Sequence, residues 1–399
     1  MAETVLEFQP DLNLDLSADR IQQEDMPTEE MLVNMGPQHP ATHGVLRVVL
    51  RTDGEMVLEA VPHIGYLHRC AEKIGETLQP YQYIPYTDRM DYLAGMNNNF
   101  AFALAVEKLS GLEAELTARV KYIRIIFCEL NRIASHLVAF GTYGLDLGAF
   151  TPFLYAFRER EYILDMFEAT CGARLTYSYI TIGGVTHDVP ENFIDVCTEF
   201  LDYFEPKVVE YNNLLSHNHI FVKRTANVGV ISQEDAIDYG LSGPVLRGSG
   251  IKFDLRKAKP YGGYDEFEFD VPVGSGEKGR TGDCWDRYIV RVREMEEAVR
   301  IIRQALEKLR GTAGQETLHK KGKSLKLPED EIYFEIENPR GQLGFYVAGD
   351  GSTIPSRVKA RGPSFCNLCV TERVCHNVLL GDMAAIIGSL DVVMGEVDR

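Results

Sequence analysis

Two histidines stand close together in the stretch GPQHPATHGVLRVVL, which spans residues 36–50. His39 and His43 are four positions apart, a spacing that suits a metal site, a catalytic pair or a simple turn. Pro40 and Gly44 oppose a helix that would present both imidazoles on one face, which disfavours a helical metal site. A catalytic loop and a structural turn both remain open.

Two further polar residues stand in apolar or crowded surroundings. Tyr92 follows the polar run YTDRMD, and its hydroxyl needs a hydrogen-bond partner if it is buried. Asp146 stands in the glycine-rich apolar stretch GTYGLDLGAF, where an unpaired carboxylate would be costly to bury. Arg89 stands between Asp88 and Asp91, and we expect it to form salt bridges with these two acids. Together these residues indicate a site that handles protons, without showing which reaction uses it.

The eight cysteines are spread from Cys70 to Cys375, which favours free thiols in a reducing compartment over a disulfide framework. One spacing, C-x2-C-x5-C-H, could bind zinc or iron, and it comprises Cys366, Cys369, Cys375 and His376. Because a second CxxC is missing and the flanks are apolar, we favour buried thiols that pack as small hydrophobes. The sequence has no Walker loop, no GxGxxG after a strand, no HExxH and no GxSxG.

Local periodicities predict the elements that must position these residues. A β-hairpin is expected over 45–65, where two apolar runs flank a TDGE turn. Three- and four-residue steps predict amphipathic helices over 120–140, 192–215 and 294–310, and the alternating Arg and Glu residues of the last are expected on an exposed face. Short strands with tight turns are expected over 331–363. The terminal MAAIIGSLDVVMGEVDR predicts a short helix and an end tied down inside the fold.

The whole pattern predicts an α+β protein, with a mainly helical central bundle and small N-terminal and C-terminal β parts. An acidic arm precedes it, since residues 1–30 carry nine acids and one base. The rest, 31–399, is expected to be one domain. Its parts are a small β part at about 31–70, a helical core at about 71–310, a flexible linker at about 311–330, and a C-terminal β part with a buried tail at 331–399.

Bulk properties exclude several classes of protein. The formal net charge of −18 opposes nucleic acid as a partner. No apolar run reaches the roughly 18 residues that a membrane span needs, so no transmembrane segment is expected. The start, MAETVLEFQP, lacks a basic region followed by an apolar one, so secretion is not expected.

Six stretches, in order along the chain, resemble one protein family. They are GPQHPATHGVLRVVL, PHIGYLHRCAEK, YTDRMDYLAGM, LDLGAFTPFLYAFRERE, GPVLRGSGIKFDLRKAKPY and GSLDVVMGEVDR. Over roughly residues 30–399 the chain resembles the 49 kDa, or D, subunit of respiratory complex I, the NADH:quinone oxidoreductase. That family is similar to the large subunit of nickel–iron hydrogenases, which implies the same kind of fold. Where hydrogenases hold their metal with two cysteine pairs, this chain has Asp91 and Ala94 and then a cysteine-free ending, so a nickel–iron centre is not expected.

The resemblance implies a subunit that forms part of a quinone-reduction site and is active only within the complex, where electron transfer is coupled to proton translocation. His43 and Tyr92 are expected to hydrogen-bond the quinone carbonyl, and Asp146 is expected to pair with His43. His39 is expected to shape the loop. Donors aimed at the carbonyl oxygens would stabilise the negative charge that develops on reduction.

Two positions are expected near the terminal iron–sulfur cluster of the neighbouring small subunit. Arg69 matches a family arginine close to that cluster, with a salt bridge to Glu72 as the alternative. Thr176 stands where many relatives have a histidine. Since threonine does not titrate near neutrality, no pH-dependent cluster potential is expected through that position. Cys70 replaces a glycine that is usual in the family.

The resemblance also implies cofactors and partners. This chain itself is expected to bind no cofactor: quinone is the substrate, the iron–sulfur cluster lies in the adjacent subunit, and NADH and FMN bind elsewhere in the complex. Expected partners are the B, C, I and H subunits, at the cytoplasmic side of the inner (cytoplasmic) membrane, as a peripheral protein. The alternatives are the large subunit of a membrane-bound energy-converting hydrogenase and a purely structural scaffold.

Overall fold

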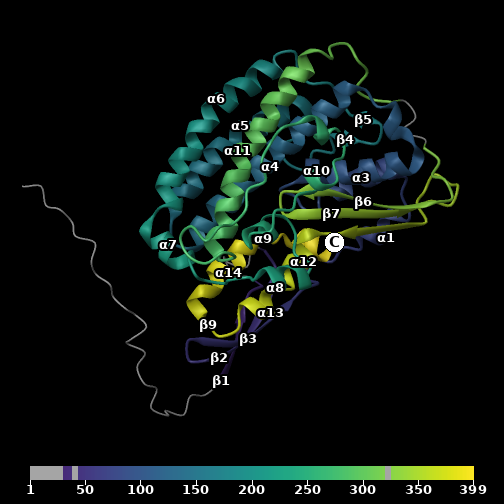
Figure 1. The fold of residues 1–399 in the computed structure, drawn as a ribbon. Coiled ribbons are helices and arrows are strands. Elements are labelled where there is room, and N and C mark those ends of the chain that lie inside the picture. The colour runs from purple at the N-terminus through teal and green to yellow at the C-terminus, as the bar shows by residue number, and fades with distance from the viewer. Residues whose placement is uncertain (1–29, 38–43, 320–324) are drawn as a thin grey trace, which may run out of the picture.

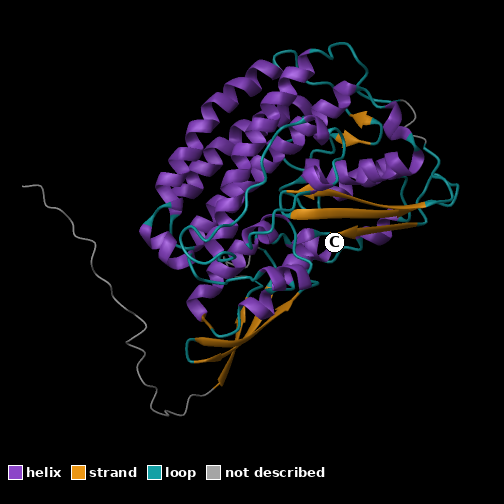
Figure 2. Ribbon diagram, in the orientation of Figure 1, coloured by secondary structure: helices purple, strands orange, loops and turns teal. Residues whose placement is uncertain are grey.

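A helical bundle, a three-stranded sheet beside it and a four-stranded sheet at the lower end make up the fold (Figures 1 and 2). This computed structural model describes residues 30–37, 44–319 and 325–399. The predictions for the acidic arm before residue 30 and for His39 and His43 lie outside the described residues. The expected α+β class, with a mainly helical centre and small β parts, is confirmed.

The four-stranded sheet contains the predicted hairpin. Strands β2 (Arg47–Asp53) and β3 (Met56–His63) pair antiparallel, and Gly54 takes the positive φ of +57° that the tight turn requires. Side chains of β2 alternate between buried and half-buried, as the two-residue period of a strand demands. The strands β1 (Glu30–Met35) and β9 (Val378–Leu379) flank the hairpin and were not predicted.

The bundle is built from four long helices, α4 (Ala118–Asp146), α5 (Phe150–Cys171), α6 (Phe193–Tyr211) and α11 (Cys284–Arg310). The helices predicted over 120–140 and 294–310 are confirmed as parts of α4 and α11. The helix predicted over 192–215 is confirmed as α6 and the π-helical turn that follows it, Asn212–Ser216. Helix α11 begins well before the predicted residue 294. The carboxylate of Asp283 caps its start by accepting a hydrogen bond from the backbone N–H of Asp286. Helix α4 packs against both α5 and α11, so most of its surface is buried.

One residue of α11 departs from the prediction of a solvent-facing Arg/Glu surface. Glu296, Arg300 and Glu307 are exposed as expected, but Glu294 is only 1% exposed. Arg247 and His136 hydrogen-bond its carboxylate, which makes burial of the charge tolerable. The prediction was therefore wrong for Glu294.

The second sheet confirms the strands expected over 331–363. Strands β6 (Glu331–Asn338), β7 (Gly341–Ala348) and β8 (Arg357–Arg361) form an antiparallel sheet. Helix α3 (Gly95–Ser110) packs on β6 and β7, above them in the view of Figure 1. The tight turn between β6 and β7 carries Arg340.

The C-terminal tail is buried, as predicted. Helices α14 (Met383–Leu390) and α15 (Met394–Asp398) have almost entirely buried side chains. The carboxylate of Asp398 accepts hydrogen bonds from the backbone N–H groups of Gly65 and Leu67, both at 2.8 Å. The C-terminal tail is therefore fastened to the loop after β3.

The predicted linker over 311–330 is described on both sides of residues 320–324. The hydroxyl of Thr117 donates to the carbonyl of Glu316 at 2.8 Å, and Leu318 forms a β-bridge with Gly184. Leu327 is completely buried. The described parts of this segment are thus held against the domain.

The remaining elements are short, namely α1 (Ala71–Gly75), α2 (Pro80–Thr87), β4 (Ile180–Thr181), β5 (Gly184–Val185), α7 (His219–Thr225), α8 (Gln233–Asp238), α9 (Gly243–Gly248), α10 (Leu255–Ala258), α12 (Pro363–Leu368) and α13 (Thr371–Val374). Across the described residues, no helix combines the length and the apolar character needed to cross a membrane.

Candidate functional site

A cavity of about 240 Å³ opens where the end of α4 meets the segment between α14 and α15. Its apolar wall is formed by Leu93, Val138, Leu145, Val392 and Val393. Five polar residues also line it: Tyr92, Thr142, Asp146, Arg340 and Asp391. The structure therefore brings together two of the predicted site residues, Tyr92 and Asp146, from distant parts of the sequence.

Tyr92 lies between α2 and α3 and is 39% exposed. Partial burial raises the pKa of its hydroxyl, and the neighbouring Asp91 and Asp391 act in the same direction, while Arg340 opposes them. The hydroxyl is therefore protonated at neutral pH and can donate a hydrogen bond into the cavity.

Asp146 is the last residue of α4 and lies against α14. A Cβ placed on Gly388 of α14 would lie 3.3 Å from Oδ2 of Asp146 and 2.7 Å from the ring of Tyr143. This close approach fixes the carboxylate at the cavity wall, because only a residue without a side chain fits at position 388.

Arg340 is a site residue that the sequence analysis missed. It is 1% exposed. Its Nη1 donates to Oδ2 of Asp91 at 2.8 Å and to the Ser135 hydroxyl at 3.0 Å. Its Nε donates to the carbonyl of Asp391 at 3.0 Å, and its Nη2 lies 3.3 Å from Oδ1 of the same residue. Arg340 thus ties the segment before Tyr92 to the segment after α14.

The predicted salt bridges of Arg89 to Asp88 and Asp91 are wrong. Arg89 is exposed and donates to the backbone carbonyl of Pro85. Asp88 instead accepts hydrogen bonds from the backbone N–H of Ser178 at 2.8 Å and from its hydroxyl at 2.7 Å, and Asp91 pairs with Arg340. The side chains of Asp88, Arg89 and Asp91 point in different directions because the chain forms a turn between α2 and α3.

Arg69 and Thr176, the two positions expected near the partner's cluster, do not line the cavity. Arg69 is exposed and donates to the carbonyls of Arg89 at 2.6 Å and Gly395 at 3.4 Å. The alternative pairing of Arg69 with Glu72 is not seen; Glu72 pairs with Arg399 at 3.4 Å.

Thr176 is half-buried, with a positive φ of +53°, in the loop after α5. Ser178, two positions on, contacts Asp88, so the segments of Arg69 and Thr176 both reach the turn at 88–89. Cys70 has a φ of +58°, the left-handed conformation that favours glycine.

The cysteine pattern near the C-terminus does not form a metal site in the structure. Cys369 is exposed, whereas burial raises the pKa of the Cys375 thiol to about 12. His376 turns away and its Nδ1 lies 2.7 Å from the carbonyl of Leu58. Among the residues that the structure describes, no three His, Cys, Asp or Glu side chains are placed to hold a metal ion.

A larger groove of about 470 Å³ lies elsewhere, between α5 and α6. Tyr162, Phe200 and Tyr203 line it, and neither Tyr92 nor Asp146 does. Asp165, Asn192 and Glu199 also line it, but it contains none of the residues that the sequence analysis predicted for the site. We therefore regard the cavity at the end of α4 as the candidate site.

Comparison with known proteins identifies the family. Residues 146–399 match the family described as the respiratory-chain NADH dehydrogenase, 49 Kd subunit. The chain belongs to this family. It is 53% identical over 378 residues to the D subunit of the NADH-quinone oxidoreductase of Chlorobium luteolum, covering 94% of this chain and 95% of that relative.

Two more relatives support the assignment. The D subunit of the NADH-quinone oxidoreductase of Chlorobium phaeovibrioides is 50% identical over the full length of both chains. A D subunit of the same enzyme from Cytophaga hutchinsonii is 50% identical, covering 93% of this chain and 96% of the relative. The expected membership in the complex I 49 kDa family, and with it the role of a subunit of an NADH:quinone oxidoreductase, is confirmed.

Proposed function

We propose that this chain forms part of the quinone-reduction site of its complex, and that the cavity at the end of α4 receives the quinone headgroup. The observation that carries the proposal is the convergence of Tyr92, Asp146 and Arg340 on one cavity that also has an apolar wall. A quinone needs both features, since its ring is apolar and its two carbonyl oxygens accept hydrogen bonds. The exposed fraction of Tyr92 is consistent with a substrate that reaches its hydroxyl from outside the chain.

Reduction of a quinone to a quinol takes up two electrons and two protons. Tyr92 would donate a hydrogen bond to one carbonyl oxygen and supply a proton as negative charge develops there. His43 would be the second donor, held by Asp146. Gly44, the residue that follows His43, supports this placement: a Cβ built on it would lie 3.7 Å from Met394, and Val393 next to Met394 lines the cavity.

The electrons would come from the terminal iron–sulfur cluster of the small subunit, and NADH and FMN would bind elsewhere in the complex. Arg69 would lie near that cluster. Its guanidinium donates to backbone carbonyls rather than to an acid among the described residues, so its positive charge is available to favour the reduced cluster. Thr176 would leave the cluster potential independent of pH through that position.

The proposal extends to the setting of the subunit. We propose that it contacts the B, C, I and H subunits, that it lies peripherally at the cytoplasmic side of the inner membrane, and that quinone reduction is coupled to proton translocation. The structural-scaffold alternative differs in one testable respect, because a scaffold needs no hydroxyl at position 92.

Tyr92→Phe in the intact complex tests the proposal. Loss of a proton donor in contact with the reacting atom should lower quinone reduction by about 100-fold or more, while NADH oxidation by a water-soluble electron acceptor stays normal. Tyr86→Phe is the matched control, because Tyr86 is 38% exposed and does not line the cavity. A Tyr92→Phe complex that assembles and reduces quinone at the normal rate would overturn the site assignment.

A further inference from the structure

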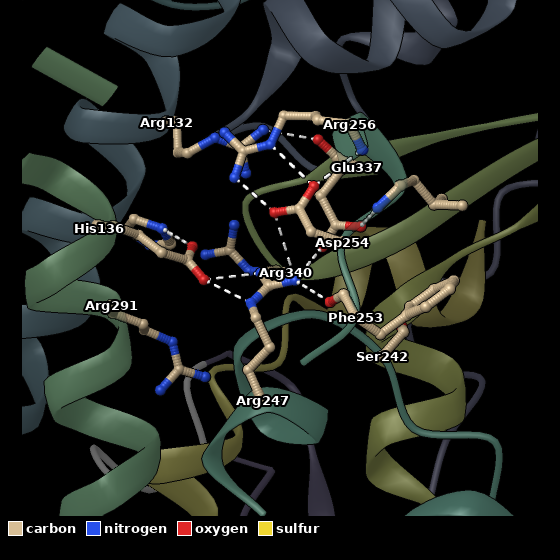
Figure 3. A network of polar contacts seen from close by, with 12 residues as sticks. Arg132, His136, Ser242, Arg247, Phe253, Asp254, Arg256, Arg291, Glu337 and Arg340 are labelled. Carbon is tan, nitrogen blue, oxygen red and sulfur yellow. Dashed lines mark hydrogen bonds and ion pairs between the residues drawn. The ribbon is translucent and has the colours of Figure 1, made fainter. Parts of the chain in front are cut away.

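A set of buried charged side chains is not yet used by the proposed reaction (Figure 3). We call it the buried ion network. None of its members is more than 2% exposed. They come from α4, the α9–α10 region, α11 and β6, and comprise Glu129, Arg132, His136, Arg247, Asp254, Arg256, Glu294 and Glu337.

Every carboxylate of the network accepts hydrogen bonds from charged or backbone donors. Glu129 accepts from Arg132 and Arg256, at 3.0 and 3.1 Å. Asp254 accepts two hydrogen bonds from Arg256, at 3.0 and 2.7 Å. Such contacts favour the ionised form of both acids.

The other two acids share Arg247. Its Nη1 donates to Glu337 at 2.8 Å and its Nε to Glu294 at 2.8 Å, and the backbone N–H of Leu255 donates to Glu337 at 3.1 Å. With all four carboxylates ionised, the three guanidiniums and a neutral His136 leave the named members with one net negative charge. Burial raises the pKa of Glu337, and the buried Arg291 of α11 adds a positive charge beside the network.

His136 is the member of the network that can remove this charge. Its Nε2 lies 2.9 Å from Oε2 of Glu294, so Nε2 carries the proton and donates to the carboxylate. Its Nδ1 is buried and has no hydrogen-bond partner among the described residues. In this tautomer Nδ1 presents a lone pair, which can accept a proton.

The charges that face His136 come from several elements. Glu294 of α11 favours the imidazolium, whereas Arg291 of α11 and Arg132 of α4 oppose it. Arg247 of α9 bears on His136 indirectly, because it hydrogen-bonds the carboxylate of Glu294. Burial is the largest effect and lowers the pKa of His136, so the imidazole is neutral at pH 7 until a further negative charge appears nearby.

Two arginines connect His136 with the cavity. Arg340 lines the cavity and donates to the hydroxyl of Ser135, the residue before His136. Arg291 lies 3.6 Å from Asp391, another cavity residue, and one helical turn before Glu294. Arg291 is attracted both by Asp391 at the cavity and by Glu294 of the network, so negative charge in the cavity acts on a cation that opposes protonation of His136.

We propose that His136 is a proton-binding residue of the quinone site, which takes up one proton at Nδ1 when reduced, negatively charged quinone forms in the cavity. The proposal rests on the proposed function. A new N–H bond forms on Nδ1, the proton comes from solvent water, and the network changes from one negative charge to none. The proton is released when neutral quinol has formed and left. His136 itself does not touch the substrate.

The experiment measures kcat and KM for quinone reduction by the membrane-bound complex between pH 6 and pH 9. Wild type should lose kcat toward high pH, because protonation of His136 becomes harder. His136→Gln should lower kcat at pH 7 by about 10-fold, the effect of one pKa unit, with an unchanged KM and without the high-pH decline. His217→Gln is the matched control, since His217 is exposed.

A merely structural role would alter assembly or KM and leave the pH profile in place, so a His136→Gln complex that keeps the wild-type profile overturns the proposal. Redox-induced infrared difference spectra of the wild-type complex with ¹⁵N-labelled histidine decide the matter if the variant does not assemble. An imidazolium band that appears with quinone reduction supports the proposal, and its absence overturns it. An active Tyr92→Phe complex would instead refute the proposed function, so the two failures are distinguishable.

Discussion

Arg340→Met is the substitution whose consequence follows most directly from the structure. Arg340 bridges Asp91 and Asp391 at the cavity, and all three side chains are buried. Removing one partner of a buried ion pair costs about 3–5 kcal/mol, because the other charge stays buried without compensation. Asp391 keeps Arg291 at 3.6 Å, whereas Asp91 keeps only the backbone N–H of Leu93 at 3.2 Å among its described contacts.

Arg340→Lys separates charge from geometry. An ammonium group can replace the ion pair with one acid, but not the forked contacts with Asp91, Ser135 and Asp391 together. Each lost hydrogen bond to a charged group is worth about 1.5–3 kcal/mol. We therefore expect an assembled complex in which Tyr92 is displaced and the KM for quinone rises by about 10-fold or more.

The assay is NADH:quinone reductase activity in membranes at varied quinone concentration, with the amount of assembled complex measured in parallel. We expect Arg340→Met to assemble poorly and to show at most a few per cent of normal activity. Arg373→Met is the control, because Arg373 is exposed and its ion pair with Asp235 is worth about 0–1 kcal/mol. Wild-type kcat and KM in a fully assembled Arg340→Met complex would refute the reasoning.

Three further outcomes are expected. Gly388→Ala should displace Tyr143 and Asp146 and cost about 1–3 kcal/mol in thermal unfolding, whereas Gly381→Ala, with one distant side-chain contact at 3.7 Å, should cost little; equal effects would contradict the packing argument. Burial raises the pKa of Glu396 to about 7 from 4.5, so the folded chain binds more protons than the unfolded chain between these values and stability falls as pH rises through them. Glu396→Gln should thus raise the stability at pH 8, by up to about 3 kcal/mol, and not at pH 4; the same change at both values would count against the shift. Cys70→Val should destabilise by about 1–2 kcal/mol and Cys70→Gly should be tolerated, since φ is +58°, which calorimetry of the two variants can check.

Much of the fold could be predicted because its signals are local. The three helices over 120–140, 192–215 and 294–310 follow from three- and four-residue apolar steps, and the hairpin over 45–65 follows from alternation around a glycine turn. Strands β1 and β9 escaped prediction. Strand β9 has two residues and a partner more than 300 positions away, at Met56 and Val57. Glu294 was misplaced because a carboxylate on a helix is read as solvent-facing unless its partners are known.

The site was predicted in part. Tyr92 and Asp146 stood out from their surroundings, and they do line one cavity. Arg340 gave no such signal, because an arginine in a tight turn between two strands is ordinarily exposed. His136 was hidden for the opposite reason: it lies on the polar side of a helix that seemed amphipathic but is buried on both sides.

The sequence by itself determined the long helices, the hairpin, the family and the residue types available for quinone chemistry. Periodicity and motif order are properties of neighbouring residues, so no contact needs to be known to read them. Only the tertiary structure decided which charges meet. Arg340 finds Asp91 across 249 positions and Asp391 across 51, and His136 finds Glu294 across 158. Such pairs depend on how α4, α11 and the C-terminal tail pack, because burial without water leaves a charge stable only beside its counterpart.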